Sequence, residues 1–268
     1  MFVVNFDKGN TMTEKKRPNW TSLLIEAITK PGTISEAYSL FHSYSFGNAM
    51  WVMAQCRSRE IVPGPIATFK KWKQVERSVS KGQKALWMWL PITTKKTDPV
   101  TGEEKTGMFF VTKKRWFVLS QTEGKDYAED MDIPNWNKEV ALKALKVEEI
   151  KFDYPDGNVL GYARKNTVSV SPLGVHPERT LFHELAHVIL GHTKEGDVVD
   201  SANTPRSIRE VEAESVSYIV CASLGIENGE EDSRGYIQEW LKDQEINQKI
   251  AGRIFSTADK ILKAGVEK

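Results

Sequence analysis

The sequence predicts an α+β fold in two domains, a small α+β domain followed by a mainly helical one. Residues 1–122 carry 19 Lys and Arg against 9 Asp and Glu, a net charge of +10, whereas residues 123–268 carry 18 against 27, a net charge of −9. Two long strand-like runs lie in the basic half, and helical spacing dominates the acidic half. An acidic, proline-containing stretch separates them. We place the first domain at residues 18–124, a linker at 125–145 and the second domain at 146–268.

In the first domain, apolar residues recur at helical spacing from Trp20 to Ile28, and Pro31-Gly32 ends that helix. Asp98-Pro99 marks a turn between two strands. The other elements expected here are a helix and two strands with the polar loop that joins them, at residues 45–56, 85–92, 108–120 and 95–107.

In the second domain, we expect residues 167–170 to form an edge strand, which could pair with an extended peptide substrate by strand addition. Pro177 and Glu178 open the helix that follows, and Gly191 ends it. The other expected elements are a short helix, two strands and three further helices, at residues 136–147, 151–154, 157–170, 207–224, 233–242 and 245–264.

The helix that begins at Pro177 carries a metal-binding pattern. Residues 183–187 read His-Glu-Leu-Ala-His, and at 3.6 residues per turn His183 and His187 lie on one face, within reach of one metal ion. Glu184 is close enough to hold and deprotonate a water on the metal. Two imidazoles and one carboxylate suit zinc with a fourth position left open. The pattern predicts a zinc-dependent hydrolase with Glu184 as its catalytic base.

The helix expected over residues 207–224 offers the missing carboxylate. Glu210 and Glu214 are spaced i, i+4 and share a face, so one can bind the metal while the other orients a ligand histidine. We predict Glu210 as the ligand and Glu214 as the orienting residue. The alternative is an ordinary solvated helix face. His192 stands at the wrong offset for a three-histidine site, and we expect it to cap its helix instead.

The first domain contains a basic stretch with aromatic residues close by. Six of the sixteen residues from 69 to 84 are basic and one is acidic, and Lys113-Lys114-Arg115 adds a second basic cluster. Cations along the backbone and aromatic faces under the bases are how proteins hold single-stranded nucleic acid. The nearby tryptophans are Trp72, Trp87, Trp89 and Trp116. The alternative is that tryptophans in the strands belong to the core, since Trp87 and Trp89 alternate with apolar residues.

Composition and termini argue against membrane and secreted classes. No run approaches the roughly 18 apolar residues of a membrane helix, and the N-terminus lacks a basic segment followed by an apolar one. Cys56 and Cys221 have neither metal-site nor disulfide spacing. We therefore expect a cytoplasmic protein with no membrane partner and two buried free thiols.

Taken together, these motifs resemble a known family. The first half is similar to the single-stranded-DNA-binding domain of ArdC-type antirestriction proteins, on the basis of residues 44–48, 68–73, 77–79, 81–85 and 117–124. The second half, with residues 183–187 and 209–214, resembles their zincin-like metallopeptidase domain, which is in turn similar to the ImmA/IrrE peptidases. Val75-Glu76-Arg77 departs from the Leu-Gly-Arg common in the family and places an acid near the expected phosphate path.

The resemblance implies a protein of a mobile element or phage, in a bacterial cytoplasm, that binds incoming single-stranded DNA and protects it from host restriction. It implies one zinc ion held by His183, His187 and Glu210, with Glu184 as the catalytic base. The DNA contacts implied by the resemblance are Asn48, Lys70, Lys71, Trp72, Lys73, Arg77, Lys81 and Lys84. We add Arg115, from the second basic cluster, to the predicted DNA contacts.

Three functional hypotheses remain open from the sequence. In the first, the protein protects DNA by binding it, and the peptidase is active or vestigial. In the second, it is a DNA-tethered regulatory protease that cleaves a repressor or a host defence protein. In the third, it is a zinc-stabilised scaffold with no role in DNA binding. Tyr218 and His176 are candidates for stabilising an oxyanion, and the peptide substrate is not indicated.

Overall fold

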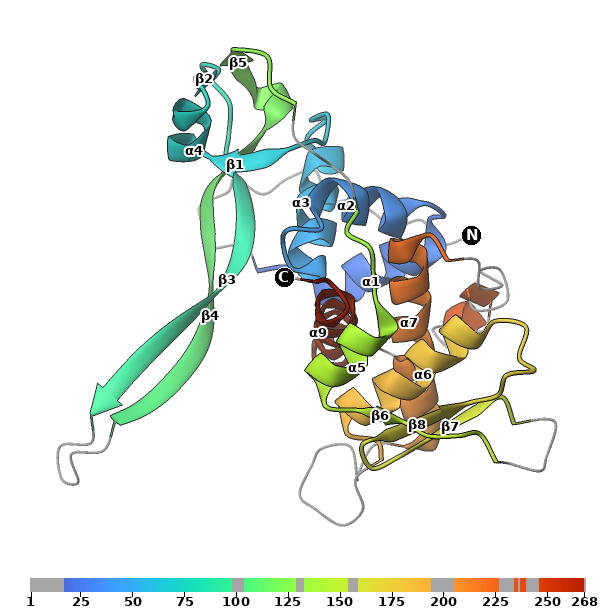
Figure 1. Cartoon of the computed structure of the whole chain (residues 1–268). Coiled ribbons are helices and arrows are strands. Elements are labelled where there is room, and N and C mark those ends of the chain that lie inside the picture. Colours follow the sequence, from blue (N-terminus) through green and yellow to red (C-terminus); the bar gives the residue numbers. More distant parts are fainter. Residues whose placement is uncertain are drawn as a thin grey trace.

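The computed structural model describes residues 17–97, 104–128, 133–153, 159–193, 205–226, 234–235, 237–239 and 246–267. It shows a helical body from which a long two-stranded β-arm projects (Figure 1). The α+β class predicted from the sequence is confirmed. Within the described residues, no helix is long and apolar enough to cross a membrane.

Three helices begin the described chain, α1 (Trp20–Thr29), α2 (Thr33–Phe41) and α3 (Phe46–Ser58). Asn19 caps α1, because its side-chain oxygen accepts a hydrogen bond from the Ser22 N–H at 3.0 Å. The helix α2 was not predicted from the sequence. The helix α1 ends at its C-cap Lys30, and Gly32, in the left-handed conformation with φ at +74°, serves as the N-cap of α2 two residues later.

The arm consists of β3 (Leu86–Thr97) and β4 (Glu104–Val118), and β4 also pairs with β1 (Ile66–Thr68). Both predicted strands are therefore present. The predicted loop at residues 95–107 is too long, because residues 95–97 and 104–107 belong to the strands. Antiparallel pairing runs out to Thr97 opposite Glu104, and residues 98–103 lie outside the described chain. The arm is longer than its apolar segments because polar residues continue the ladder. The remaining elements of this half form a small module at the root of the arm: α4 (Phe69–Gln74), β2 (Arg77–Val79), the 3₁₀ turn η1 (Leu119–Gln121) and β5 (Thr122–Gly124).

The second half has a small three-stranded sheet, β6 (Glu148–Glu149), β7 (Gly161–Arg164) and β8 (Thr167–Val170), in the order β6-β8-β7. The prediction that residues 167–170 form an edge strand is wrong. This strand pairs on one side with β6, in parallel, and on the other with β7, antiparallel, so it occupies the centre. Among the described strands, β7 is the edge strand that packs against the helix at residues 177–190.

The helices of the second half that lie within the described residues are α5 (Lys138–Leu145), α6 (Pro177–Leu190), α7 (Arg206–Leu224) and α9 (Gln248–Ala264). All of them lie inside or close to predicted helices. Of the helix expected at 233–242, only residues 234–235 and 237–239 are described.

The helix α9 joins the two halves. It packs against α1 and α3 on one side and against α6 and α7 on the other. The Trp20 and Phe255 rings meet edge to face at 5.9 Å, and the Phe46 N–H donates to the Asp259 carboxylate at 2.9 Å. The predicted linker at residues 125–145 contains α5, which also packs on α9. The two-domain division stays a prediction, and the buried core is continuous across it.

Candidate metal centre and nucleic-acid interface

The helix α6 holds the two histidines of the metal-binding pattern. Pro177 occupies its first turn, and Gly191 ends it in the left-handed conformation at φ +79°, as the sequence predicts. One turn apart on the same face, His183 and His187 bring their Nε2 atoms to 3.1 Å from each other. Two nitrogens this close, from rings packed at 4.8 Å, are arranged to share one cation.

The helix α7 packs along α6 and supplies a carboxylate to the same point. Oε2 of Glu210 lies 3.5 Å from His183 Nε2 and 3.6 Å from His187 Nε2. For metal–ligand bonds of about 2.0–2.1 Å in a tetrahedral arrangement, ligand atoms stand roughly 3.3–3.4 Å apart. The three observed separations bracket that value, so the donor set and its spacing fit a small divalent cation such as zinc.

Glu214 lies behind His183, on the far side of the ring from this point. Its Oε2 accepts a hydrogen bond from His183 Nδ1 at 3.2 Å, while its Oε1 pairs with Arg179 at 2.6 Å. The carboxylate is 8% exposed. A buried carboxylate bound to the free ring nitrogen fixes the tautomer that leaves Nε2 available for a metal.

His187 has an equivalent partner that sequence reasoning missed. Its Nδ1 lies 3.0 Å from His192 Nδ1, and His192 Nε2 lies 3.1 Å from Oε2 of Glu212, which is fully buried. The bonds are all satisfied when His187 donates to His192 and His192 donates to Glu212. Arg253 of α9 stands 3.5 Å from the other oxygen of Glu212. The only signal in the sequence was that three of five histidines fall within ten residues.

The site shifts the pKa values of its acids and bases. Burial alone lowers the pKa of His183, but hydrogen bonds to Glu210 and Glu214 outweigh it and raise the pKa to about 9. Hydrogen bonds with His183 and His187 hold the pKa of Glu210 far below its usual range. Burial raises the pKa of Glu184, although the nearby charges of His183 and His187 act against it. A carboxyl group with a raised pKa is suited to take up and return a proton near neutral pH.

Among the described strands, the edge strand β7 lies directly against the part of α6 that carries Thr180 and Glu184. A Cβ added to Gly161 would stand 2.5 Å from Thr180 Cγ2 and 3.3 Å from Glu184 Cγ. Only a glycine permits this approach. Of the two oxyanion candidates, Tyr218 is buried in α7 and His176 immediately precedes α6.

The lysines predicted to contact DNA are exposed around the root of the arm. The exposed residues among the predicted contacts are Lys70, Lys71, Lys73, Lys81, Lys84 and, on β4, Arg115. Lys73 lies over the ring of Phe69, 5.1 Å from its centroid, and Phe69 is itself 47% exposed. These side chains can reach a polyanion without any rearrangement of the backbone.

The other three predicted contacts are engaged inside the fold. Asn48 is buried, and its amide donates to the Trp89 carbonyl at 2.9 Å and accepts from the Trp89 N–H at 2.8 Å. Trp72 is 1% exposed and donates to the Phe117 carbonyl. The Arg77 guanidinium donates hydrogen bonds to the side-chain oxygen and the carbonyl oxygen of Thr122, on β5. Direct DNA contact by these three residues stays a prediction, and their bonds give each a structural role.

Residues 14–118 match the family model described as the N-terminal domain of anti-restriction factor ArdC. The fold is similar to two crystal structures of the antirestriction protein ArdC from the R388 plasmid. The metal-free structure is 20% identical, with a TM-score of 0.52 over 92% of this chain and 94% of that chain. The Mn(II)-bound structure is 16% identical, with a TM-score of 0.51 over 93% and 98%. A comparison with curated proteins finds no match.

Proposed function

We propose that the chain is an ArdC-type antirestriction protein that binds incoming single-stranded DNA and carries a zinc-dependent peptidase site. The match of residues 14–118 to the N-terminal ArdC domain and the similarity of the fold support this proposal. The convergence of His183, His187 and Glu210 beside Glu184 is the observation that carries the enzymatic part. The DNA-binding part is supported by the exposed cations around the arm. In this proposal the protein belongs to a mobile element or phage and shields DNA from host restriction.

The proposed peptidase chemistry is distributed over three elements. A zinc ion held by His183, His187 and Glu210 would polarise the carbonyl under attack and lower the pKa of water. Glu184 takes the proton of that water and returns it to the leaving amine. The strand β7 offers its free edge to an extended peptide next to Glu184, which is the role first predicted for residues 167–170.

Metal identity needs its own measurement, because imidazole and carboxylate donors also accept manganese. Titration calorimetry of the metal-free protein with Zn²⁺ and with Mn²⁺ gives both affinities, and we expect Zn²⁺ to bind more tightly. Glu210→Ala should weaken both metals. Equal metal binding by wild type and Glu210→Ala would remove Glu210 from the ligand set.

The DNA-binding part is tested by fluorescence anisotropy with a single-stranded oligonucleotide and the corresponding duplex across a salt series. We expect a preference for the single strand and an affinity that falls steeply as salt rises, because phosphate neutralisation releases counterions. Equal affinity for the single strand and the duplex, or no binding to either, would contradict this part of the proposal.

The second candidate function is a DNA-tethered regulatory protease, which the intact Glu184 and the open β7 edge favour. Glu184→Gln separates the two, since Glu184 is not among the metal donors and its loss should leave metal and DNA binding intact. If Glu184→Gln still protects transferred DNA from restriction in cells, protection rests on DNA binding. If protection is lost while DNA affinity is unchanged, proteolysis carries the function.

A further inference from the structure

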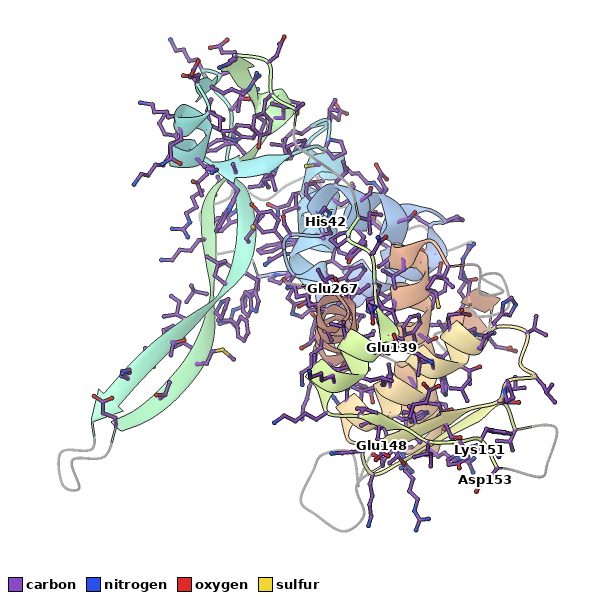
Figure 2. The ribbon with its side chains drawn as sticks, in the orientation of Figure 1. His42, Glu139, Glu148, Lys151, Asp153 and Glu267 are labelled. Carbon is purple, nitrogen blue, oxygen red and sulfur yellow. The ribbon has the colours of Figure 1, made fainter. Side chains whose placement is uncertain are left out.

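The outer part of the β3–β4 arm projects away from the helical body (Figure 2) and carries exposed apolar side chains. Among its side chains Met108 is 65%, Phe109 48% and Phe110 45% exposed. Near its root the arm contacts α3 and α4, and Trp89 also meets Trp20 of α1. Large apolar side chains gathered on a projecting element indicate that a partner covers them.

The register divides these side chains between two faces. Trp87 pairs with Lys114, Trp89 with Thr112 and Pro91 with Phe110, so these six residues share one face of the arm, here called the tryptophan face. Phe109 pairs with Ile92, one position along each strand, and therefore belongs to the opposite face. Two neighbouring phenylalanines thus lie on opposite sides of the arm.

The tryptophan face carries a row of aromatic rings. The Trp89 and Phe110 rings stack nearly parallel, at 4° with centroids 5.7 Å apart. Towards the body, Trp20 meets Trp89 edge to face at 6.4 Å. Phe110, at the outer end of this row, is also the ring left about half exposed. A further planar ring can extend the stack there.

The charge of the arm is complementary to a polyanion. Strands β3 and β4 contain five lysines and Arg115 against a single acid, Glu104. Lys114 lies over the Trp87 ring at 5.8 Å, next to the aromatic row. Arg115 falls at the β-bulge where the register shifts between Leu86 and Trp87, and it is exposed. A bulge of this kind redirects a side chain away from the regular alternation.

The inner end of the row opens on a second basic surface. Trp20 also lines a groove of about 1590 Å³ that follows α9 and is separate from the metal ligands. Among the residues lining this groove, five are cationic and one is acidic: Lys143, Lys249, Arg253, Lys260 and Lys263 against Asp259. Positive charge therefore lies beside the inner part of the aromatic row, from Lys114 and Arg115 on the arm and from this groove next to Trp20.

We propose that the tryptophan face is a base-stacking surface for single-stranded nucleic acid, with a base on the exposed ring of Phe110, which itself stacks on Trp89, and phosphates on Lys114 and Arg115. The inference rests on the proposed DNA-binding function and names the surface that performs it. A single strand fits better than a duplex, because only unpaired bases expose the ring faces that an aromatic row can stack. A protein partner would need neither parallel rings nor adjacent cations.

Phe110→Ala and Phe109→Ala form a matched pair for testing the face. Anisotropy titrations use a fluorescent oligothymidylate and a strand of equal length whose bases are replaced by abasic sites. Phe110→Ala should weaken oligothymidylate binding by between about fivefold and about 150-fold, the range for loss of one stacked base. It should leave the abasic strand unaffected, since no phosphate contact is lost. Phe109→Ala should bind both strands as the wild type does.

The salt slope adds a readout that separates stacking from charge. Phe110→Ala should keep the wild-type slope, whereas Arg115→Gln should reduce it by about one. Circular dichroism and thermal midpoints confirm that each variant is folded, and light scattering measures its mass.

Each outcome decides between the hypotheses. If the wild type binds no single strand, the proposed function fails and this inference with it. If the wild type binds but Phe110→Ala matches it, or if Phe109→Ala is weakened equally, the assignment of the face is overturned while DNA binding stands. It is also overturned if Phe110→Ala converts a dimer to a monomer, because the face would then be covered by a second copy of the chain.

Discussion

At the scale of single residues, His192 lies outside the recognised motif and yet contacts the candidate metal centre. It bridges His187 to the buried Glu212, as Glu214 supports His183 from the other side. Loss of such a supporting residue weakens metal binding by about 10–100-fold in comparable sites. We expect His192→Ala to lower zinc affinity by that factor, measured by competition with a chelator, while His42→Ala, which removes a histidine of α2's C-terminal end, leaves it unchanged.

A second measurement shows whether His192 affects metal binding by fixing the position of the ligand His187. The visible absorption of bound Co²⁺ reports coordination geometry, and it should change in His192→Ala but not in His42→Ala. A His192→Ala protein with wild-type affinity and an unchanged cobalt spectrum would show that the His187–His192 contact has no influence on the site.

Cys56 gives the fold a dependence on alkaline pH. Burial raises the pKa of its thiol from 9.0 to about 11. The folded state thus favours the neutral thiol, so the stability this provides is fully present below about pH 9 and is lost as the pH rises through about 11. Unfolding free energies from urea titrations should fall across this window more steeply in the wild type than in Cys56→Ala. Identical slopes would contradict the assignment.

At the scale of elements, the close contact between β7 and α6 is the feature that holds the free edge beside Glu184. Gly161→Ala would force a methyl group to 2.5 Å from Thr180, so strand and helix must separate. We expect a loss of about 1–3 kcal/mol in the free energy of unfolding, measured in urea. Gly174→Ala is the control, since its Cβ would lie 3.5 Å from the nearest atom, the Ser171 carbonyl oxygen. Equal midpoints for the two variants would exclude the predicted clash.

The elements also show where sequence reasoning works and where it ends. The helix α6 was predictable because its start at Pro177, its end at Gly191 and its ligand spacing are all local features. The central position of β8 was not, because strand order depends on the distant partners β6 and β7. The same limit applies to Asn48: a motif marks it as important, but only the fold shows its side chain bonded to Trp89.

At the scale of the whole molecule, α9 determines how the two halves respond to metal. Because it packs against α1 and α3 as well as α6 and α7, stabilisation at the metal centre should reach the N-terminal helices. A metal at 100 times its dissociation constant stabilises the native state by about 2.7 kcal/mol. Six of the eight tryptophans precede residue 122, so tryptophan emission reports mainly the N-terminal half, whereas circular dichroism reports all helices.

We therefore expect thermal unfolding followed by emission and by circular dichroism to give coincident midpoints, and both to rise together when zinc is added. Glu184→Gln should keep this rise, because Glu184 is not among the metal donors, and Glu210→Ala should lose it. If zinc moves the midpoint seen by circular dichroism while the emission midpoint stays in place, the halves unfold independently. The boundary near residues 125–145 would then separate two autonomous domains, despite the core that they share in the native state.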